Sequence, residues 1–112
     1  MGGYSVTTRI GGRVERQKLD QLEAALTTLE RKARELEASS RAAPTGGGLM
    51  RRFEPVQQVG GRIELAAPRG VRAGVDVRGD GSSEAFTGRV RRKLVAQQDG
   101  ESPYDALRRV LR

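Results

Sequence analysis

The chain contains no cysteine and no histidine. The missing thiols exclude disulfides and thiolate nucleophiles, and the missing imidazole removes the commonest general base. Zinc sites of the usual kind draw on the same two residue types and are excluded with them. Asp76, Asp80 and Glu84 flank a turn without the spacing of a calcium loop. No serine, lysine or carboxylate pair stands out as a nucleophile with its base, so we expect neither an enzyme nor a metal or cofactor site.

Aromatic side chains are scarce, with two tyrosines, two phenylalanines and no tryptophan in 112 residues. A core must therefore be built from Leu, Val, Ile and Ala, and we expect a small margin of stability. The length fits one small domain over residues 1–112. Burial against a second copy would enlarge such a core, so self-association is one interpretation of the composition.

Long apolar runs are absent, and none approaches the roughly 20 residues that a bilayer-crossing helix needs. The N-terminus lacks the apolar stretch of a signal peptide. Val6 occupies the position where a myristoylation signal has Ser or Thr. We therefore expect a cytoplasmic protein without a membrane partner, and no small-molecule ligand is evident.

Positive charge is in excess, because 21 Lys and Arg face 14 Asp and Glu for a net charge of +7. Residues 62–98 hold eight basic and four acidic side chains, a local excess of +4. Arginine outnumbers lysine 18 to 3, which a GC-rich coding sequence also produces. Part of the excess can therefore reflect coding bias rather than function.

The first residues alternate in polarity from Tyr4 to Ile10, which predicts a β-strand. Gly11-Gly12 indicates a turn, followed by a return strand from Val14 to Lys18. A two-residue loop pairs Ile10 with Arg13, whereas a three-residue loop pairs Ile10 with Val14 and keeps the apolar side chains on one face. We expect the three-residue loop.

The clearest pattern in the chain is a leucine stripe in the segment 20–38. Its spacings of three and four place the stripe on one face of a helix. The members are Leu19, Leu22, Leu26, Leu29, Ala33 and Leu36. Asp20 and Glu23 predict a capped start, and Ser39-Ser40 predicts the end. The stripe either packs on the chain's own sheet or forms a seam with a partner helix, through Leu22, Leu26, Leu29 and Leu36.

Residues 39–61 read as a Gly/Pro linker and an irregular segment, and residues 62–112 read as strands followed by a C-terminal helix. Strands are expected over 62–67, over 71–77 and from Ser83 onward. The segment 87–98 either continues that strand or forms a short helix, and we expect a long strand. Ser102, Pro103 and Asp105 predict the start of the last helix.

These elements predict an α+β fold, in which β-hairpins form an antiparallel sheet of about five strands. The sheet packs on one long helix and one short C-terminal helix. Each half has a Gly-turned hairpin followed by a capped helix, so a duplicated hairpin–helix unit is a further interpretation.

The basic run from Arg89 to Lys93 is the sharpest functional candidate. On a strand, alternate side chains project about 6.5 to 7 Å apart, which is close to the spacing of phosphates on a nucleic-acid strand. The nucleic-acid-binding candidates are Arg69, Arg72, Arg78, Arg89, Arg91, Arg92 and Lys93. The alternative is a solvated strand whose charges prevent edge-to-edge pairing.

Two functional hypotheses follow. The first is a small basic, non-catalytic binding module whose second-half arginines contact nucleic-acid phosphates. The second is a protein-interaction or assembly subunit that uses the leucine stripe or a sheet edge. Convergence of the arginines on one open face would favour the first hypothesis, and pairing with Glu64, Asp76 and Glu84 would weaken it.

Overall fold

A computed structural model describes residues 3–42, 59–88 and 91–112. Within these residues, six strands form a single antiparallel sheet of order β2-β1-β3-β4-β5-β6. The strands are β1 (Tyr4–Ile10), β2 (Arg13–Leu19), β3 (Val59–Ala66), β4 (Arg72–Arg78), β5 (Ser83–Thr87) and β6 (Lys93–Leu94). The helices are α1 (Leu22–Ala42) and α2 (Pro103–Leu111), and a 3-10 turn, η3 (Pro68–Gly70), links β3 to β4. The predicted α+β fold is confirmed, with six strands in place of about five.

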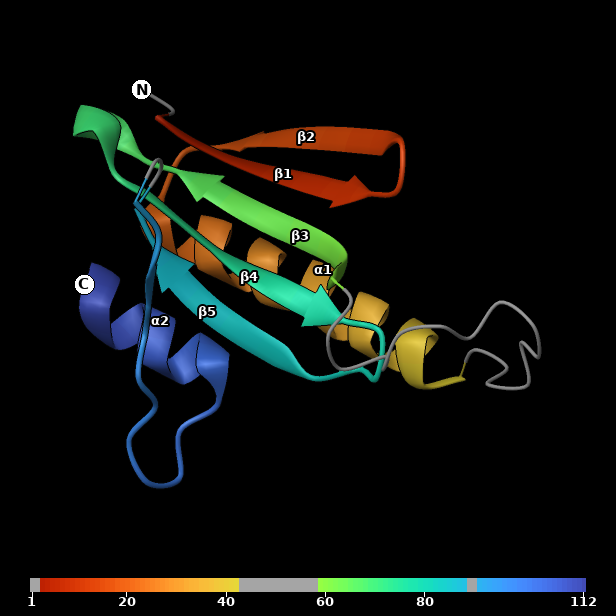
Figure 1. Cartoon of the computed structure of the whole chain (residues 1–112). Helices are drawn as coiled ribbons and strands as arrows, with labels where there is room; N and C mark the ends of the chain where they lie inside the picture. Colours follow the sequence, from red (N-terminus) through yellow and green to blue (C-terminus); the bar gives the residue numbers. More distant parts are fainter. Residues whose placement is uncertain (1–2, 43–58, 89–90) are drawn as a thin grey trace.

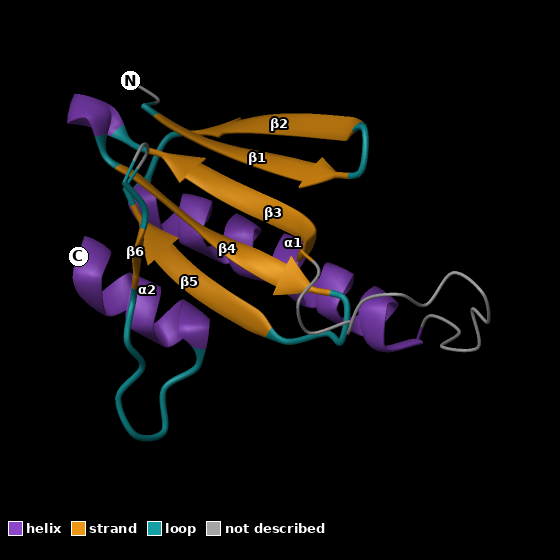
Figure 2. Cartoon of the chain, viewed as in Figure 1, coloured by secondary structure: helices purple, strands orange, loops and turns teal. Residues whose placement is uncertain are grey.

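Both helices lie on the same side of the sheet, behind it in the view of Figure 1. The long helix α1 packs against β1, β3 and β4, and the short helix α2 packs against β5 (Figure 2). Strand residues alternate between the helix side and the other side, as a half-covered antiparallel sheet requires. In β3, for example, Ile63 and Leu65 are fully buried while Arg62 and Glu64 point to the other face.

The core lies between the sheet and the two helices. Its largest buried side chains include Leu26 and Leu29 from α1, Val75 and Val77 from β4, and Leu107 from α2. Burying each side chain of this size contributes about 1.5 to 3 kcal/mol. The aliphatic core that the composition predicts is thus assembled from both halves of the chain.

The leucine stripe packs on the chain's own sheet. Leu26 and Leu29 are 2% and 1% exposed, and Leu22 and Leu36 pack against the edge of the core. Of the four residues proposed as contacts for a partner helix, Leu26 and Leu29 are therefore buried within the chain, and Leu22 and Leu36 are partly buried. Helix α1 begins at Leu22, and the carbonyl of Gln21, not Asp20, accepts its first hydrogen bond. The helix also continues past Ser39-Ser40 to Ala42.

The first hairpin has the two-residue loop, so the expected three-residue loop is wrong. Ile10 pairs with Arg13 and Arg9 pairs with Val14 across Gly11-Gly12. Gly11 has a φ of 58°, which glycine adopts readily in tight hairpin turns. Apolar matching did not decide the register, because β2 lies at the sheet edge, where every residue from Arg13 to Lys18 is exposed.

The expected long strand over 87–98 is also wrong. Strand β5 ends at Thr87, and the two-residue strand β6 pairs antiparallel with Phe86 and Thr87. Gly88 permits this reversal with a φ of 97°, and a Cβ there would lie 2.5 Å from the carbonyl oxygen of Arg91. Gly88 therefore has a backbone conformation that a residue with a side chain would adopt only with strain.

The start of α2 is as predicted. The Ser102 hydroxyl accepts a hydrogen bond from the Asp105 amide at 3.0 Å, and the Asp105 carboxylate accepts one from the Ser102 amide at 3.1 Å. Pro103 occupies the first turn, where its missing N–H costs nothing. Most of the predicted linker and irregular segment, from 43 to 58, lies outside the described residues. Within the described ranges, neither α1 nor α2 is long and apolar enough to cross a membrane.

Candidate nucleic-acid interface

The face of the sheet opposite the helices, here called the open face, collects charged side chains from all six strands or their ends. No helix of the described residues covers it (Figure 1). Its basic residues are Arg9, Arg16, Lys18, Arg62, Arg72, Arg78 and Arg92, and its acidic residues are Glu64, Asp76 and Glu84. Seven basic against three acidic side chains leave an excess of +4 on this one surface.

Carboxylates on the open face pair with four of its arginines. Glu64 contacts Arg9 at 2.7 Å and Arg92 at 3.4 Å, so one carboxylate serves two guanidinium groups. Asp76 accepts two hydrogen bonds from Arg62, one of them 3.1 Å long, and this contact raises the pKa of Arg62. Such exposed or half-exposed pairs contribute little to stability, but they reduce the charge available to a ligand.

Glu84 likewise pairs with Arg78. Glu64, Asp76 and Glu84 are therefore all paired with arginine. This is the pairing that weakens the nucleic-acid hypothesis.

Three cations on the open face remain without a carboxylate partner among the described residues. They are Arg16 and Lys18 on β2 and Arg72 on β4. The Arg72 guanidinium donates to the carbonyl oxygens of Val71 at 2.9 Å and Ala67 at 3.5 Å. These bonds orient the side chain without neutralising its charge.

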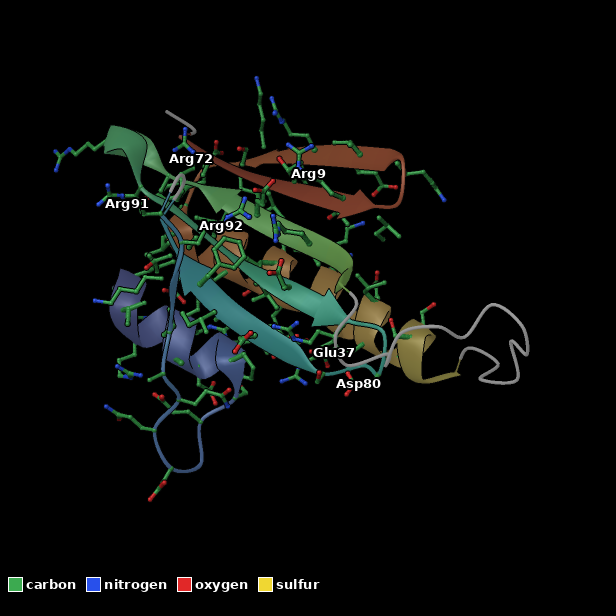
Figure 3. The ribbon with its side chains drawn as sticks, in the orientation of Figure 1. Arg9, Glu37, Arg72, Asp80, Arg91 and Arg92 are labelled. Carbon is green, nitrogen blue, oxygen red and sulfur yellow. The ribbon has the colours of Figure 1, made fainter. Side chains whose placement is uncertain are left out.

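A hollow of about 370 Å³ lies in the open face. The arginines that line it come from four different parts of the sheet: Arg9, Arg16, Arg72 and Arg92. The hydroxyl-bearing Ser5 and Thr7 and the carboxylate Glu64 also line it. In Figure 3, the labelled Arg9, Arg72 and Arg92 lie over the face of the sheet that is turned toward the viewer. Four cations against one carboxylate give the lining of this hollow a net positive charge.

The ring of Phe86 forms part of the lining and is almost fully covered, at 3% exposed. The Arg92 guanidinium carbon lies 5.0 Å from the ring centroid and that of Arg62 lies 5.5 Å from it, both within cation–π distance. Opposite Phe86 in the next strand is Gly74, where a Cβ would lie 2.6 Å from the ring's Cζ. The absence of a side chain at Gly74 is what lets the ring lie across β4.

The seven candidates from the sequence do not form a single strand face. Arg72 and Arg92 line the hollow, and Arg78 lies on the same face with its charge paired to Glu84. Arg69 is exposed in η3, and Arg91 is exposed two residues before β6.

Two further candidates complete the set. Lys93 pairs with Thr87, which places it on the helix side of the register. Arg89 lies outside the described residues.

Four basic residues of the open face were not among the sequence candidates: Arg9, Arg16 and Lys18 from the first hairpin and Arg62 from β3. For Arg16 and Lys18 the reason is the hairpin register, because a one-residue shift moves every side chain of β2 to the other face. The three-residue loop would place Glu15 and Gln17 beside Arg9 and Thr7. The observed two-residue loop instead places Arg16 opposite Thr7 and Lys18 opposite Ser5. Gly11-Gly12, the signature of a two-residue turn, was the signal that could have placed Arg16 and Lys18 on this face.

Comparison with known proteins finds no matching family model, no matching curated protein and no matching solved structure.

Proposed function

We propose that this chain is a small, non-catalytic nucleic-acid-binding module that contacts phosphates through the open face of its sheet. The observation that carries the proposal is the hollow lined by Arg9, Arg16, Arg72 and Arg92 against the single carboxylate Glu64. Basic β-sheet surfaces bind nucleic acid mainly through their phosphates, because each neutralised phosphate releases condensed counterions.

The unpaired cations support the proposal more strongly than the total charge does. An arginine already paired with a carboxylate must give up that contact to bind a phosphate, whereas Arg16, Lys18 and Arg72 have no such contact to lose within the described chain. Arg16 and Lys18 are two residues apart on β2, so their Cα atoms are about 7 Å apart. Arginine also offers a planar pair of donors that matches phosphate oxygens.

A salt titration of binding to fluorescent oligonucleotides, measured by anisotropy, tests the proposal. We expect binding at low salt that weakens steeply as salt is added. The variant Arg16→Ala with Arg72→Ala should bind at least tenfold more weakly. Each phosphate contact to a single strand contributes about 0.7 to the slope of log K against log salt, so this variant should lower the slope by about 1.4.

The matched control removes the same charge elsewhere. Arg13 and Arg31 are exposed, their ion pairs within the described residues are long at 3.8 Å, and neither lines the hollow. The variant Arg13→Ala with Arg31→Ala should therefore keep most of the affinity. Absence of binding at low salt, or equal losses in the two double variants, would refute the proposal.

The exposed edge of β2 favours a second candidate, an assembly subunit. Strand β2 is seven residues long, has no described neighbour on its outer side, and exposes 56% of Val14. Its charged residues oppose edge-to-edge pairing, which is why we place this candidate second. Sedimentation across a range of protein concentrations would reveal self-association, and a strictly monomeric mass would exclude a homo-oligomer.

A further inference from the structure

The geometry of the hollow points to a single-stranded ligand. We propose that the Arg92 guanidinium, supported by Phe86, is a stacking platform for one nucleobase, and that Arg16 and Arg72 hold an adjoining phosphate. The inference rests on the proposed nucleic-acid function and deepens it by naming which form of nucleic acid the site takes.

Arg92 is held in place from two directions. Its guanidinium lies over the Phe86 ring, with 5.0 Å between the guanidinium carbon and the ring centroid, and it contacts the Glu64 carboxylate at 3.4 Å. Its side chain is nevertheless 36% exposed and lines the hollow. A planar cation with one side on an aromatic ring and part of its surface open is pre-organised to accept a second planar group.

A nucleobase is the planar group that suits this platform. Proteins that bind single strands stack unpaired bases on aromatic rings and on arginine guanidinium planes. A base inside a duplex already stacks on both neighbours and cannot reach such a platform without being extruded. The stacking contact therefore favours single strands or loops, whereas phosphate contacts alone would accept a duplex as well.

The rest of the hollow suits a phosphate next to that base. Arg72 is aimed by the carbonyl oxygens of Val71 and Ala67, and Arg16 faces the hollow from β2. The volume of about 370 Å³ is within the range of small-ligand sites and is a recess rather than a flat track. The recess accommodates a unit of nucleotide size, with its base on Arg92 and its phosphate between Arg16 and Arg72.

Arg62 provides an internal comparison on the same ring. It also lies over Phe86, at 5.5 Å, but its guanidinium makes two hydrogen bonds to Asp76 and it does not line the hollow. Arg92→Lys and Arg62→Lys thus make the same chemical change beside the same ring, keeping the charge and removing the guanidinium plane. Only Arg92→Lys changes the proposed platform.

The experiment measures affinities at one salt concentration for a single strand, a duplex with the same number of phosphates, and a single strand with abasic sites. The full chain should bind the single strand about tenfold more tightly than the duplex or the abasic strand. Arg92→Lys should weaken single-strand binding about tenfold, with unchanged duplex binding and an unchanged salt slope. Arg62→Lys should leave the preference for single strands intact.

Two outcomes would overturn the inference, and they differ from failure of the proposed function. The first is equal affinity for the normal and abasic strands, which needs no variant and is independent of any folding defect. The second is an equal effect of Arg92→Lys and Arg62→Lys in variants whose circular dichroism matches that of the parent. In both cases phosphate binding through Arg16 and Arg72 would persist, whereas absence of all binding at low salt would remove the proposed function as well.

Discussion

The Tyr104 hydroxyl donates a hydrogen bond to the Glu37 carboxylate and thereby joins the short helix α2 to the long helix α1. Both side chains are buried, at 2% and 8% exposed, and Ser83 of β5 donates a second hydrogen bond to the same carboxylate at 2.5 Å. Burial, reinforced by the hydrogen bond to Glu37, raises the pKa of Tyr104 well above its usual range. The contact ties together three elements that only tertiary folding brings near one another.

Removing that hydroxyl should destabilise the protein. Tyr104→Phe leaves the buried Glu37 carboxylate with one donor fewer, and we expect a loss of about 1 to 3 kcal/mol in the free energy of unfolding. Urea denaturation monitored by circular dichroism measures the loss. Tyr4→Phe is the control, because the Tyr4 hydroxyl has no hydrogen-bond partner within the described residues. Equal stability of the two variants would contradict the role of the contact.

Gly74 should tolerate no side chain. A Cβ at this position would lie 2.6 Å from both the Phe86 ring and the carbonyl oxygen of Ile63, and the second of these cannot move without distorting β3. We expect Gly74→Ala to destabilise the fold by about 1 to 3 kcal/mol. Displacement of the ring should also disturb Arg92 and weaken nucleic-acid binding.

Gly12 is the control position for the Gly74→Ala substitution. A Cβ there would meet nothing within 4 Å, and its φ is not in the left-handed region. Gly12→Ala should therefore change urea stability by less than about 0.5 kcal/mol. A Gly74→Ala protein as stable as Gly12→Ala would show that Phe86 does not lie across β4.

Leu29 should behave as a core residue rather than as an interface residue. It is 1% exposed beneath the sheet, so Leu29→Ala should cost about 2 to 5 kcal/mol through lost burial and the cavity that remains. Leu94, at 62% exposed, is the control, and Leu94→Ala should be nearly neutral in the same urea titration. A Leu29→Ala protein with unchanged stability but reduced self-association would instead support a helical seam.

Acid should remove the stabilisation that the Glu101 carboxylate provides at the start of α2. Hydrogen bonds from Arg109 at 2.9 and 3.0 Å, together with the Gln98 amide at 2.8 Å, lower the pKa of Glu101 below its ordinary value of 4.5. A carboxyl with a lowered folded-state pKa stabilises the fold above the unfolded value, and that stabilisation is lost as pH falls through the folded value. Glu101→Gln should therefore be less stable than the parent at pH 7, and the difference should shrink toward pH 3.

Urea denaturation at both pH values, with an NMR titration of the Glu101 carboxyl, measures this effect. The same experiment on Asp99, an exposed carboxylate two residues earlier in the chain, provides the comparison. A Glu101 carboxyl that titrates at or above 4.5 would contradict the prediction.

Local patterns were sufficient for the parts of the fold that depend on neighbours in sequence. The alternation of Tyr4 to Ile10 predicted a strand because side chains point to opposite faces at every step. Ser102 and Asp105 predicted the start of α2 because both bonds of the capping box are made within four residues. The leucine spacing predicted α1 and the face that it buries.

The candidate site is formed by residues that are distant in sequence and are brought together by strand pairing. Arg9 and Glu64 lie 55 residues apart in sequence and meet at 2.7 Å only because β1 pairs with β3. Likewise, no local pattern shows that Glu64 also contacts Arg92, or that Arg92 lies over Phe86. An excess of arginine is visible in the composition, but its division into paired and unpaired cations depends on which strands are neighbours.

The sequence by itself determined the element types, the aliphatic core and the absence of thiol and imidazole chemistry, because these depend on composition and on short periodicities. The face that each residue of β2 occupies and the residue at which β5 ends are known only from the tertiary structure. At Gly11-Gly12 the loop length sets the face of every residue of β2, because a one-residue shift would move each side chain to the other side of the sheet. At Gly88 a positive φ follows the end of β5. The candidate site depends on both features, because Arg16 from β2 and Arg92, which precedes β6, line the same hollow.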